Sequence, residues 1–335
     1  MVEQRSPKPR VVSSSLATPA TGLGFMKFED VENSRIRYRE KVVKSFLISM
    51  GVSVLVALII FLAVSRVHLP IIAMVPAILM PLFFAIVISA IVVILTTGKD
   101  AEAYRKAYKA YFVEQNLSRT FIDLKYNHDA GLDKQILKNT EMIHTGDRYS
   151  SNDLTMGKYK DVEFTQADVH IQERYEDKDG NTHYTTIFLG RFMIFEFPKK
   201  FSFRLEVVSK FFGAKKVPGK NQQTGRKFEK FEVESPNFNK KFKIYAEDGF
   251  ETFYLLDPAF IERIERLGDA YQKKMLLGFI DNKLYVGLDE RKDSFEAPSP
   301  FKPIDEQAEL EKVHKDIKVI TDFVNELRLD RKIFS

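Results

Sequence analysis

Residues 45–65 read SFLISMGVSVLVALIIFLAVS, a run of 21 residues that contains no Asp, Glu, Lys or Arg. After Arg66, a second run without these residues, Val67–Gly98, adds 32 more. A bilayer core of about 30 Å is crossed by about 20 apolar residues in a helix. Each run is therefore long enough to span a membrane, and we predict spans at about 45–65 and 76–97.

The second run is longer than one span needs, and it carries Pro70, Pro76 and Pro81. Proline lacks a backbone donor and is tolerated best in the first turn of a helix. We therefore place the turn of a helical hairpin at Arg66–Pro70. A pair of buried helices in a soluble core is one alternative. A cleaved signal peptide is another, although its apolar region would begin nearer the N-terminus than residue 45.

Basic residues flank the two runs on the side opposite to the predicted turn. They are Arg35, Arg37, Arg39, Lys41 and Lys44 before the first run, and Lys99, Arg105, Lys106 and Lys109 after the second. Positively charged flanks remain in the cytoplasm. We therefore predict that both termini are cytoplasmic. Neither run holds a charged residue that would mark an ion path, so we expect an anchor rather than a transporter.

The charge of the chain is unevenly distributed. Residues 1–98 contain 10 basic and 5 acidic residues, whereas residues 99–335 contain 41 of each. The C-terminal part is thus neutral, which argues against a nucleic-acid partner because such proteins carry a basic domain. The chain has no cysteine, so disulfides, thiol catalysis and cysteine-bound metals are excluded.

Composition and periodicity divide the chain into four parts. Residues 1–24 are rich in Ser, Thr, Pro and Ala, and we predict a disordered tail because few large apolar groups are present. Residues 25–98 should form a juxtamembrane helix and the transmembrane hairpin. Residues 99–150 are predicted to be a helical connector, with aromatic residues at helical spacing in its first part. Residues 151–330 should form a cytoplasmic domain.

This domain shows strand patterns followed by helix patterns, which predicts an α+β fold with a mainly antiparallel sheet and flanking helices. An Asp179-Gly180 pair between two strand patterns predicts a hairpin, and Asp248-Gly249 predicts a second one. Further strands are expected at Phe203–Val208, Phe228–Glu234, Lys241–Ala246 and Thr252–Leu255, and a short hairpin around Asp281-Asn282. Helices are expected around Asp133–Asn139, after the cap Asp257-Pro258, and after the cap Asp305.

No catalytic, cofactor-binding or metal-binding residues are predicted from motifs. The loop Asp177–Asn181 resembles a calcium loop, but an EF-hand with Gly180 in sixth place would need acidic groups where Tyr175 and Thr186 stand. The sequence lacks a Walker motif, a G-x-S-x-G motif and an H-E-x-x-H motif. If the domain is an enzyme, His170, His183 and Asp168 are the first residues to test.

One segment is locally basic. Lys210–Lys230 holds seven basic residues and one acidic residue, Glu229. Basic residues near an anionic membrane surface each contribute about 1 kcal/mol of binding energy. The candidates for such a contact are Lys215, Lys216, Lys220, Arg226 and Lys227. The alternative is a solvated loop whose lysines maintain solubility.

Four segments, in this order, carry a resemblance to a known family. They are Val162–Asp168, Ile187–Phe192, Glu234–Tyr245 and Tyr254–Ile261. Together with the preceding membrane hairpin they resemble the bacterial domain-of-unknown-function family numbered 3137, over most of residues 30–330. The Ser- and Pro-rich start of the chain is not part of this pattern.

The resemblance implies a multi-pass protein of the bacterial inner membrane with a cytoplasmic domain and no established enzymatic activity. It also implies a membrane-protein partner of the LemA type, because family members are often encoded beside such proteins. It offers no catalytic residues. Our first hypothesis is therefore a membrane-anchored binding or scaffolding protein without a cofactor. The alternatives are a membrane-associated enzyme that acts on lipid or envelope precursors, and a regulator that senses anionic lipid.

Overall fold

A computed structural model describes residues 26–65, 71–196, 203–221, 225–272 and 274–330. The chain divides into two compact units. The helical unit comprises the described parts of 22–113 and residues 296–310, and the sheet unit comprises the described parts of 114–295 and 311–335. The predicted disordered tail, 1–24, and the predicted hairpin turn, 66–70, lie outside the described residues.

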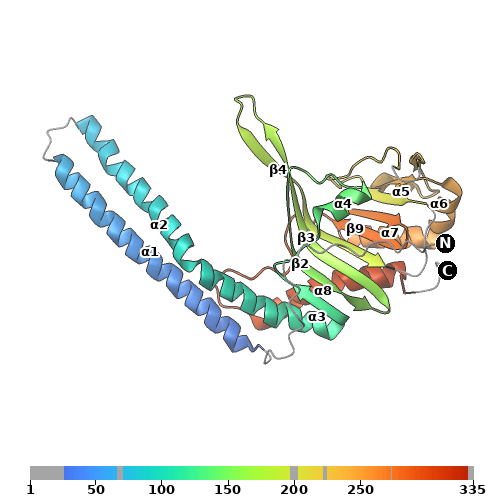
Figure 1. Cartoon of the computed structure of the whole chain (residues 1–335), viewed down its shortest axis with the longest axis horizontal. Helices are drawn as coiled ribbons and strands as arrows, with labels where there is room; N and C mark the ends of the chain where they lie inside the picture. Colours follow the sequence, from blue (N-terminus) through green and yellow to red (C-terminus); the bar gives the residue numbers. More distant parts are fainter. Residues whose placement is uncertain (1–25, 66–70, 197–202, 222–224, 273, 331–335) are drawn as a thin grey trace, which may run out of the picture. The chain divides into compact units, whose positions relative to one another are not determined.

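Two long helices form most of the helical unit (Figure 1). α1 (Phe28–Ser65) and α2 (Ile71–Tyr108) each have 38 residues and pack against each other. Both are long and apolar enough to cross a membrane. The predicted helices are therefore confirmed, and each is longer than the predicted span. α2 begins before Pro76, and it continues into a π-helical turn, η1 (Lys109–Glu114), and α3 (Gln115–Thr120).

In their apolar parts, the buried residues of α1 and α2 have small side chains. Ser49 on α1 and Ala85, Ser89 and Thr97 on α2 are buried, and the Thr96 Oγ1 donates to Ser45 Oγ at 3.2 Å. The large apolar side chains of both helices point outward instead. They include Leu47, Ile48, Leu55, Ile59, Phe83, Ile88, Ile94 and Leu95, all at least half exposed. This arrangement is the reverse of a water-soluble helix pair, which buries its large side chains.

The predicted aromatic stripe after the second span is confirmed as a buried face. Tyr104 and Tyr108 are buried, and their hydroxyls donate to Pro298 O at 3.0 Å and to Glu309 Oε2 at 2.6 Å. Tyr111 donates to a carboxylate oxygen of Glu306. The polar tips of these rings thus bind residues 298–309, which belong to the same unit.

Within the described residues, nine strands form one sheet in the order β1-β2-β3-β4-β9-β8-β5-β7-β6, and every neighbouring pair is antiparallel. The α+β class and the mainly antiparallel sheet are therefore confirmed. The strands are β1 (Ile122–Asn127), β2 (Arg148–Tyr159), β3 (Val162–Glu176), β4 (Thr182–Glu196), β5 (Leu205–Ser209), β6 (Glu229–Phe231), β7 (Phe242–Ala246), β8 (Met275–Ile280) and β9 (Lys283–Leu288).

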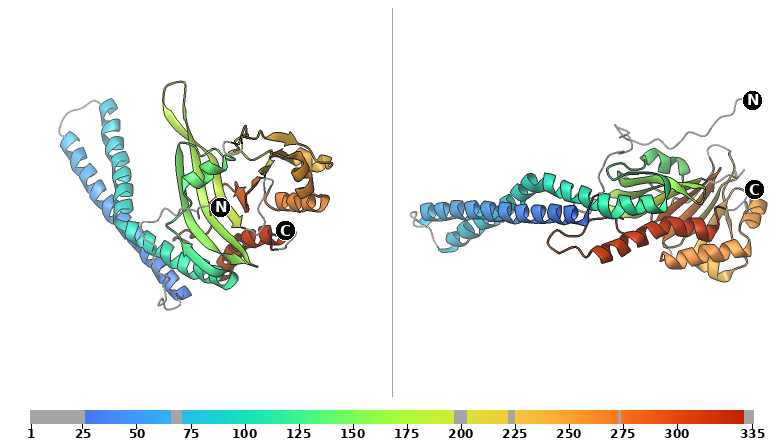
Figure 2. Two further views of the ribbon diagram at one scale, coloured as in Figure 1. Left: turned by 45° about the vertical axis from the view of Figure 1, so that its right-hand side comes forward. Right: turned by 90° about the horizontal axis from the view of Figure 1, so that it is seen from below.

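Both faces of the sheet are covered (Figure 2). On one face, Phe188, Phe192 and Ile194 of β4 join a cluster with Leu137 of α4 (Lys134–Thr140). On the other face, Phe195 stacks with Phe323 of α8 (Glu306–Leu327), with ring centroids 6.3 Å apart. α7 (Pro258–Ala270) also covers this second face, through the contact of Phe260 with Phe279. Strands buried on both sides are apolar along their length, so the alternation typical of half-exposed strands is weak in β4.

Most predicted turns and caps are confirmed. Gly180 takes a positive φ of 82° in the turn between β3 and β4, and the short hairpin predicted around Asp281-Asn282 joins β8 to β9. The tip of the β3–β4 hairpin extends beyond β2, which pairs with β3 as far as Gln172 (Figure 1). Asp133, Asp257 and Asp305 cap α4, α7 and α8 as expected.

Two predictions are wrong in the segment after β7. Thr252–Leu255 is not a strand, and Asp248-Gly249 is not a hairpin turn. Asp248 caps a short helix, α6 (Gly249–Leu255), by accepting the Glu251 N–H at 3.1 Å. Thr252, Leu255 and Leu256 are buried at helical spacing, so packing and the cap outweigh the strand preference of the β-branched and aromatic residues.

The predicted helical connector, 99–150, is wrong in its second half. β1 and the first residues of β2 lie inside it, because their backbone groups pair with the rest of the sheet. β1 is an edge strand with an irregular register, and it therefore lacks a clear period of two. The helix α5 (Pro236–Lys241), capped by Ser235, was not predicted either.

A close backbone approach between β4 and β9 makes Gly190 a sensitive position. A Cβ atom there would lie 2.1 Å from the Leu288 carbonyl oxygen. We predict that Gly190→Ala lowers the free energy of unfolding by about 2 kcal/mol, because the backbone must move apart. Thermal unfolding of the detergent-solubilised chain, followed by circular dichroism, measures this. Gly219→Ala is the control, since a Cβ there meets nothing within 4 Å; an equal loss in both variants would contradict the prediction.

Candidate functional site

The five predicted basic residues lie in the segment between β5 and β6. Lys216, Lys220, Arg226 and Lys227 are exposed, and Lys220 and Lys227 face each other as bridge partners. Lys215 is half-buried, and its pKa is lowered by burial and by the neighbouring Lys243 ammonium. Of the five, Lys216 lines a pocket.

This pocket has a volume of about 270 Å³ and is lined by polar side chains from three segments. They are Gln135, Lys138 and Asn139 of α4, Glu141 just after it, Arg204 at the start of β5, and Lys216 and Asn221 of the basic loop. Three of these side chains are cationic and one is anionic. The pocket is therefore formally positive by two charges.

Arg204 forms the inner wall of the pocket and is 7% exposed. It donates to the Thr140 carbonyl oxygen at the C-terminal end of α4, and its Nη1 lies 3.6 Å from Glu141 Oε2. Its Nε is buried and, among the described residues, has no hydrogen-bond partner. The Phe228 ring lies over the guanidinium, 5.7 Å from it. The side chain is thus held in place while one donor is left over.

A buried carboxyl lies behind Arg204. Glu206 on β5 is 1% exposed, and its Oε1 has no hydrogen-bond partner among the described residues. Burial raises the pKa of Glu206 to about 8, and the Glu141 and Glu247 carboxylates add to this rise against the Arg204 guanidinium. At neutral pH, Glu206 is therefore largely uncharged and adds little negative charge beside Arg204, which forms its ion pair with Glu141.

A second ionic cluster lies on the opposite face of the sheet, around Arg191. Arg191 is fully buried in β4, and its Nη2 donates to Asp316 Oδ1 of α8 at 2.5 Å. Its Nε lies 2.8 Å from Glu290 Oε2 as an ion pair without hydrogen-bond alignment. Although burial opposes the charge, the carboxylates of Glu290, Asp316 and Asp168 raise the pKa of Arg191.

Asp168 of β3 pairs with Arg191 across the strands and is fully buried. Its Oδ2 accepts the Ser294 backbone N–H at 2.6 Å, whereas its Oδ1 has no hydrogen-bond partner among the described residues. Burial raises the pKa of Asp168 to about 7, although Arg191 lowers it. These groups bind each other and the chain around them, which indicates a structural role for the cluster.

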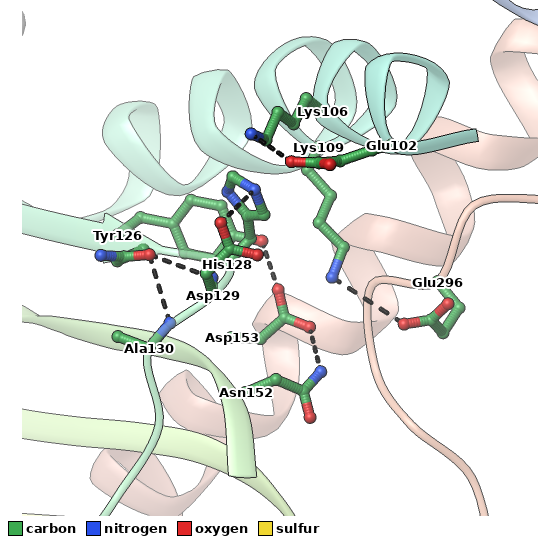
Figure 3. A network of polar contacts seen from close by, with 11 residues as sticks. Glu102, Lys106, Lys109, Tyr126, His128, Asp129, Ala130, Asn152, Asp153 and Glu296 are labelled. Atoms are coloured by element: carbon green, nitrogen blue, oxygen red, sulfur yellow. Dashed lines mark hydrogen bonds and ion pairs between the residues drawn. The ribbon is translucent and has the colours of Figure 1, made fainter. Parts of the chain in front are cut away.

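Asp153 extends this polar row toward β1. The Tyr126 hydroxyl donates to Asp153 Oδ1 at 2.5 Å, and Asn152 Nδ2 donates to Asp153 Oδ2 at 2.8 Å (Figure 3). Burial and the Asp153 charge raise the pKa of Tyr126 well above its usual value, so the phenol keeps its proton. The register of β2 against β3 shifts at this point, between Asn152 and Thr155.

The three residues proposed for an enzymatic site do not converge. His170 is bound to Thr186 Oγ1 at 2.9 Å, and His183 to Asp177 Oδ2 at 2.7 Å near the tip of the β3–β4 hairpin. Asp168 instead faces Arg191 and Ser294. Across the described part of the chain, no group of three His, Asp or Glu side chains gathers as a metal site would require.

Sequence reasoning named Asp168 and Lys216 as candidates but missed the residues with which the structure groups them. Arg191 and Asp168 lay within the segments that carried the family resemblance, but Asp316 and Glu290 are distant in sequence and gave no signal. Arg204 and Glu206 lay in a predicted strand. A charged pair at alternate positions of an otherwise apolar strand was the available clue, because such residues are rarely buried without a partner.

Glu206 gives a prediction about stability and pH. Its pKa is raised by folding, so its contribution to stability is complete below pH 4.5 and is lost as the pH rises to about 8. We predict that Glu206→Gln removes this loss, so that the variant gains about 2–4 kcal/mol relative to the unmodified chain between pH 5 and pH 8. Urea unfolding of the detergent-solubilised chain at several pH values measures the difference.

A matched control for this experiment is Glu173→Gln, which makes the same change in net charge at an exposed position. A gain of the same size and pH dependence in both variants would show that net charge, and not burial of Glu206, is responsible.

Comparisons with known proteins agree with the sequence resemblance. No curated protein matches the chain significantly. Among solved structures, the crystal structure of the mycobacterial trehalose monomycolate transport factor A, TtfA, aligns with a TM-score of 0.32 and 9% identity, over 67% of this chain and 93% of that one; a similarity this distant carries no argument. Residues 186–329 match the model of the family described as Protein of unknown function (DUF3137). This match supports the family resemblance that the sequence indicated.

Proposed function

We propose that the protein is a membrane-anchored binding or scaffolding module without catalytic activity. In this proposal α1 and α2 cross the inner membrane of a bacterium, both termini are cytoplasmic, and the sheet unit binds another membrane protein. The observation that carries the anchor is the outward orientation of large apolar side chains on both helices, whereas the small residues Ser49, Ala85 and Ser89 are buried.

This orientation is suited to a lipid environment. A monomeric soluble protein rarely exposes a contiguous apolar patch larger than a few hundred Å². In a bilayer, the lipid tails solvate such side chains, and small residues let helix backbones approach closely. α1 has 38 residues, which at a rise of 1.5 Å is about 57 Å and exceeds a bilayer core of about 30 Å. Its charged first half, up to Lys44, would then lie outside the core.

The cytoplasmic placement is supported by the positive flanks of the two spans. Lys41 near the start of the first span forms an ion pair with Asp100 at the end of the second, with 2.5 Å between Nζ and Oδ2. Both ends of the hairpin thus meet on one side, which is the side that carries the basic residues. The helices contain no charged group within their apolar runs, which favours anchoring over transport.

The binding role is supported by an exposed aromatic surface on α6. Phe250, Phe253 and Tyr254 are 82%, 55% and 74% exposed. Phe253 contacts Phe231 of β6, so this surface adjoins the edge strand of the described sheet. Exposed aromatic residues and strand edges are common features of protein-binding surfaces. A LemA-type membrane protein is the partner that the family resemblance suggests.

The predicted orientation is testable because the chain has no cysteine. We predict that Lys178→Cys, at the exposed tip of the β3–β4 hairpin, reacts with a membrane-impermeant maleimide in inside-out vesicles and not in right-side-out vesicles. After permeabilisation both preparations should react, which controls for access to the thiol. Reaction in intact right-side-out vesicles would place the domain outside the cell. Extraction of the membranes with alkaline sodium carbonate tests the anchor, and release of the chain into the soluble fraction would contradict it.

The binding surface is testable by cysteine crosslinking in native membranes. We expect Phe250→Cys to form an adduct of one defined size, since this residue is the most exposed of the α6 aromatics. Lys178→Cys on the hairpin is the matched exposed control and should not form the adduct. Absence of any protein adduct from Phe250→Cys, at a thiol that still reacts with maleimide, would contradict the scaffolding proposal.

A further inference from the structure

We propose that the pocket between α4, the start of β5 and the basic loop binds a phosphoryl group, carried either by a lipid headgroup or by a small soluble compound. This inference goes beyond the anchoring and scaffolding role and does not depend on it. It rests on the donors that line the pocket, on their charge, and on the size of the space.

The pocket offers hydrogen-bond donors that the protein itself does not use. Within the described residues, the Lys138 and Lys216 ammonium groups have no ion-pair partner, and the buried Arg204 Nε has no acceptor. Asn139 accepts a hydrogen bond from Gln135 through its Oδ1 at 2.6 Å, which leaves its amide N–H groups available. An anion in the pocket would accept charge-assisted hydrogen bonds from the two exposed lysines.

The acidic groups near the pocket either interact with Arg204 or Asn221 or are protonated. Glu141 lies 3.6 Å from the Arg204 Nη1, and the Thr140 carbonyl at the end of α4 accepts a hydrogen bond from Arg204. Glu247 accepts hydrogen bonds from the Asn221 side chain and from the Arg204 backbone N–H. Glu206 is largely protonated at neutral pH. The pocket therefore keeps a net positive charge.

The dimensions of the pocket select a small ligand group. A volume of about 270 Å³ lies just below the range of about 300–1,000 Å³ that holds a drug-sized molecule. The lining is polar throughout, so an apolar body would gain little there. A guanidinium with two lysines is a common phosphate-binding set, because arginine supplies a fixed fork and lysine a mobile charge.

A single tryptophan can report on binding, since the chain has none. Phe228→Trp places the indole beside Arg204. The full chain in phosphatidylcholine nanodiscs is titrated with inorganic phosphate at pH 7 and constant ionic strength, and fluorescence is recorded. The lipid source is tested in nanodiscs that contain phosphatidic acid, compared with nanodiscs of equal charge made with phosphatidylserine.

A saturable fluorescence response to inorganic phosphate alone indicates a soluble ligand. A fluorescence change in phosphatidic acid nanodiscs, absent with phosphatidylserine, indicates a lipid headgroup.

The decisive variant is Lys138→Gln with Lys216→Gln, made in the reporter chain. Both lysines are exposed, so the fold should be unaffected. Binding should weaken by about tenfold or more, the loss expected when charge-assisted hydrogen bonds are removed. The matched control, Lys178→Gln with Lys302→Gln, makes the same charge change at exposed positions elsewhere and should bind as before.

Two results would overturn the proposal. One is the absence of a response to phosphate and to phosphatidic acid, confirmed by calorimetry on the unmodified chain. The other is an equal loss in the control pair, which would assign the effect to net charge and not to this pocket.

Discussion

The Arg191 guanidinium ties together four parts of the sheet unit that are distant in sequence. It lies in β4, binds Asp316 of α8, lies against Glu290 after β9, and faces Asp168 of β3. A fully buried cation is costly unless carboxylates and hydrogen bonds compensate it, and removal of one partner from such a pair costs about 3–5 kcal/mol. Burial of Arg191 therefore requires that β3, β4, α8 and the segment after β9 pack together. The packing of α8 on this face of the sheet depends on that requirement.

The two buried carboxyls with raised pKa values illustrate how surroundings decide what the same group does. Asp168 is enclosed by Arg191 and the Ser294 backbone, and the groups around it belong to the folded chain itself. Glu206 is buried close to Arg204, which lines an open pocket, and its neutral form adds no negative charge there. The first group lies in a closed core, whereas the second borders a pocket whose lining carries a net positive charge.

The two compact units follow opposite packing rules. In the apolar part of the helical unit, small side chains such as Ser89 are buried and large apolar ones point outward. In the sheet unit, large side chains such as Phe192 and Phe195 fill both faces of β4. Burial of a leucine side chain gives no hydrophobic stabilisation to a helix that is surrounded by lipid. In water, burial of each large apolar side chain stabilises the fold by about 1.5–3 kcal/mol. This contrast is the physical basis for the proposed anchor.

The sequence by itself determined the elements that depend on local rules. The charge-free runs predicted α1 and α2, aspartates predicted the starts of α4, α7 and α8, and Asp179-Gly180 predicted the longest hairpin. Tertiary structure decided what local rules cannot express. Packing of Thr252 and Leu255 turned a strand-like segment into α6, and pairing with β2 made β1 a strand. The pocket and the Arg191 cluster join residues far apart in the chain, and such contacts exist only once the sheet has brought β3, β4 and β5 to one place.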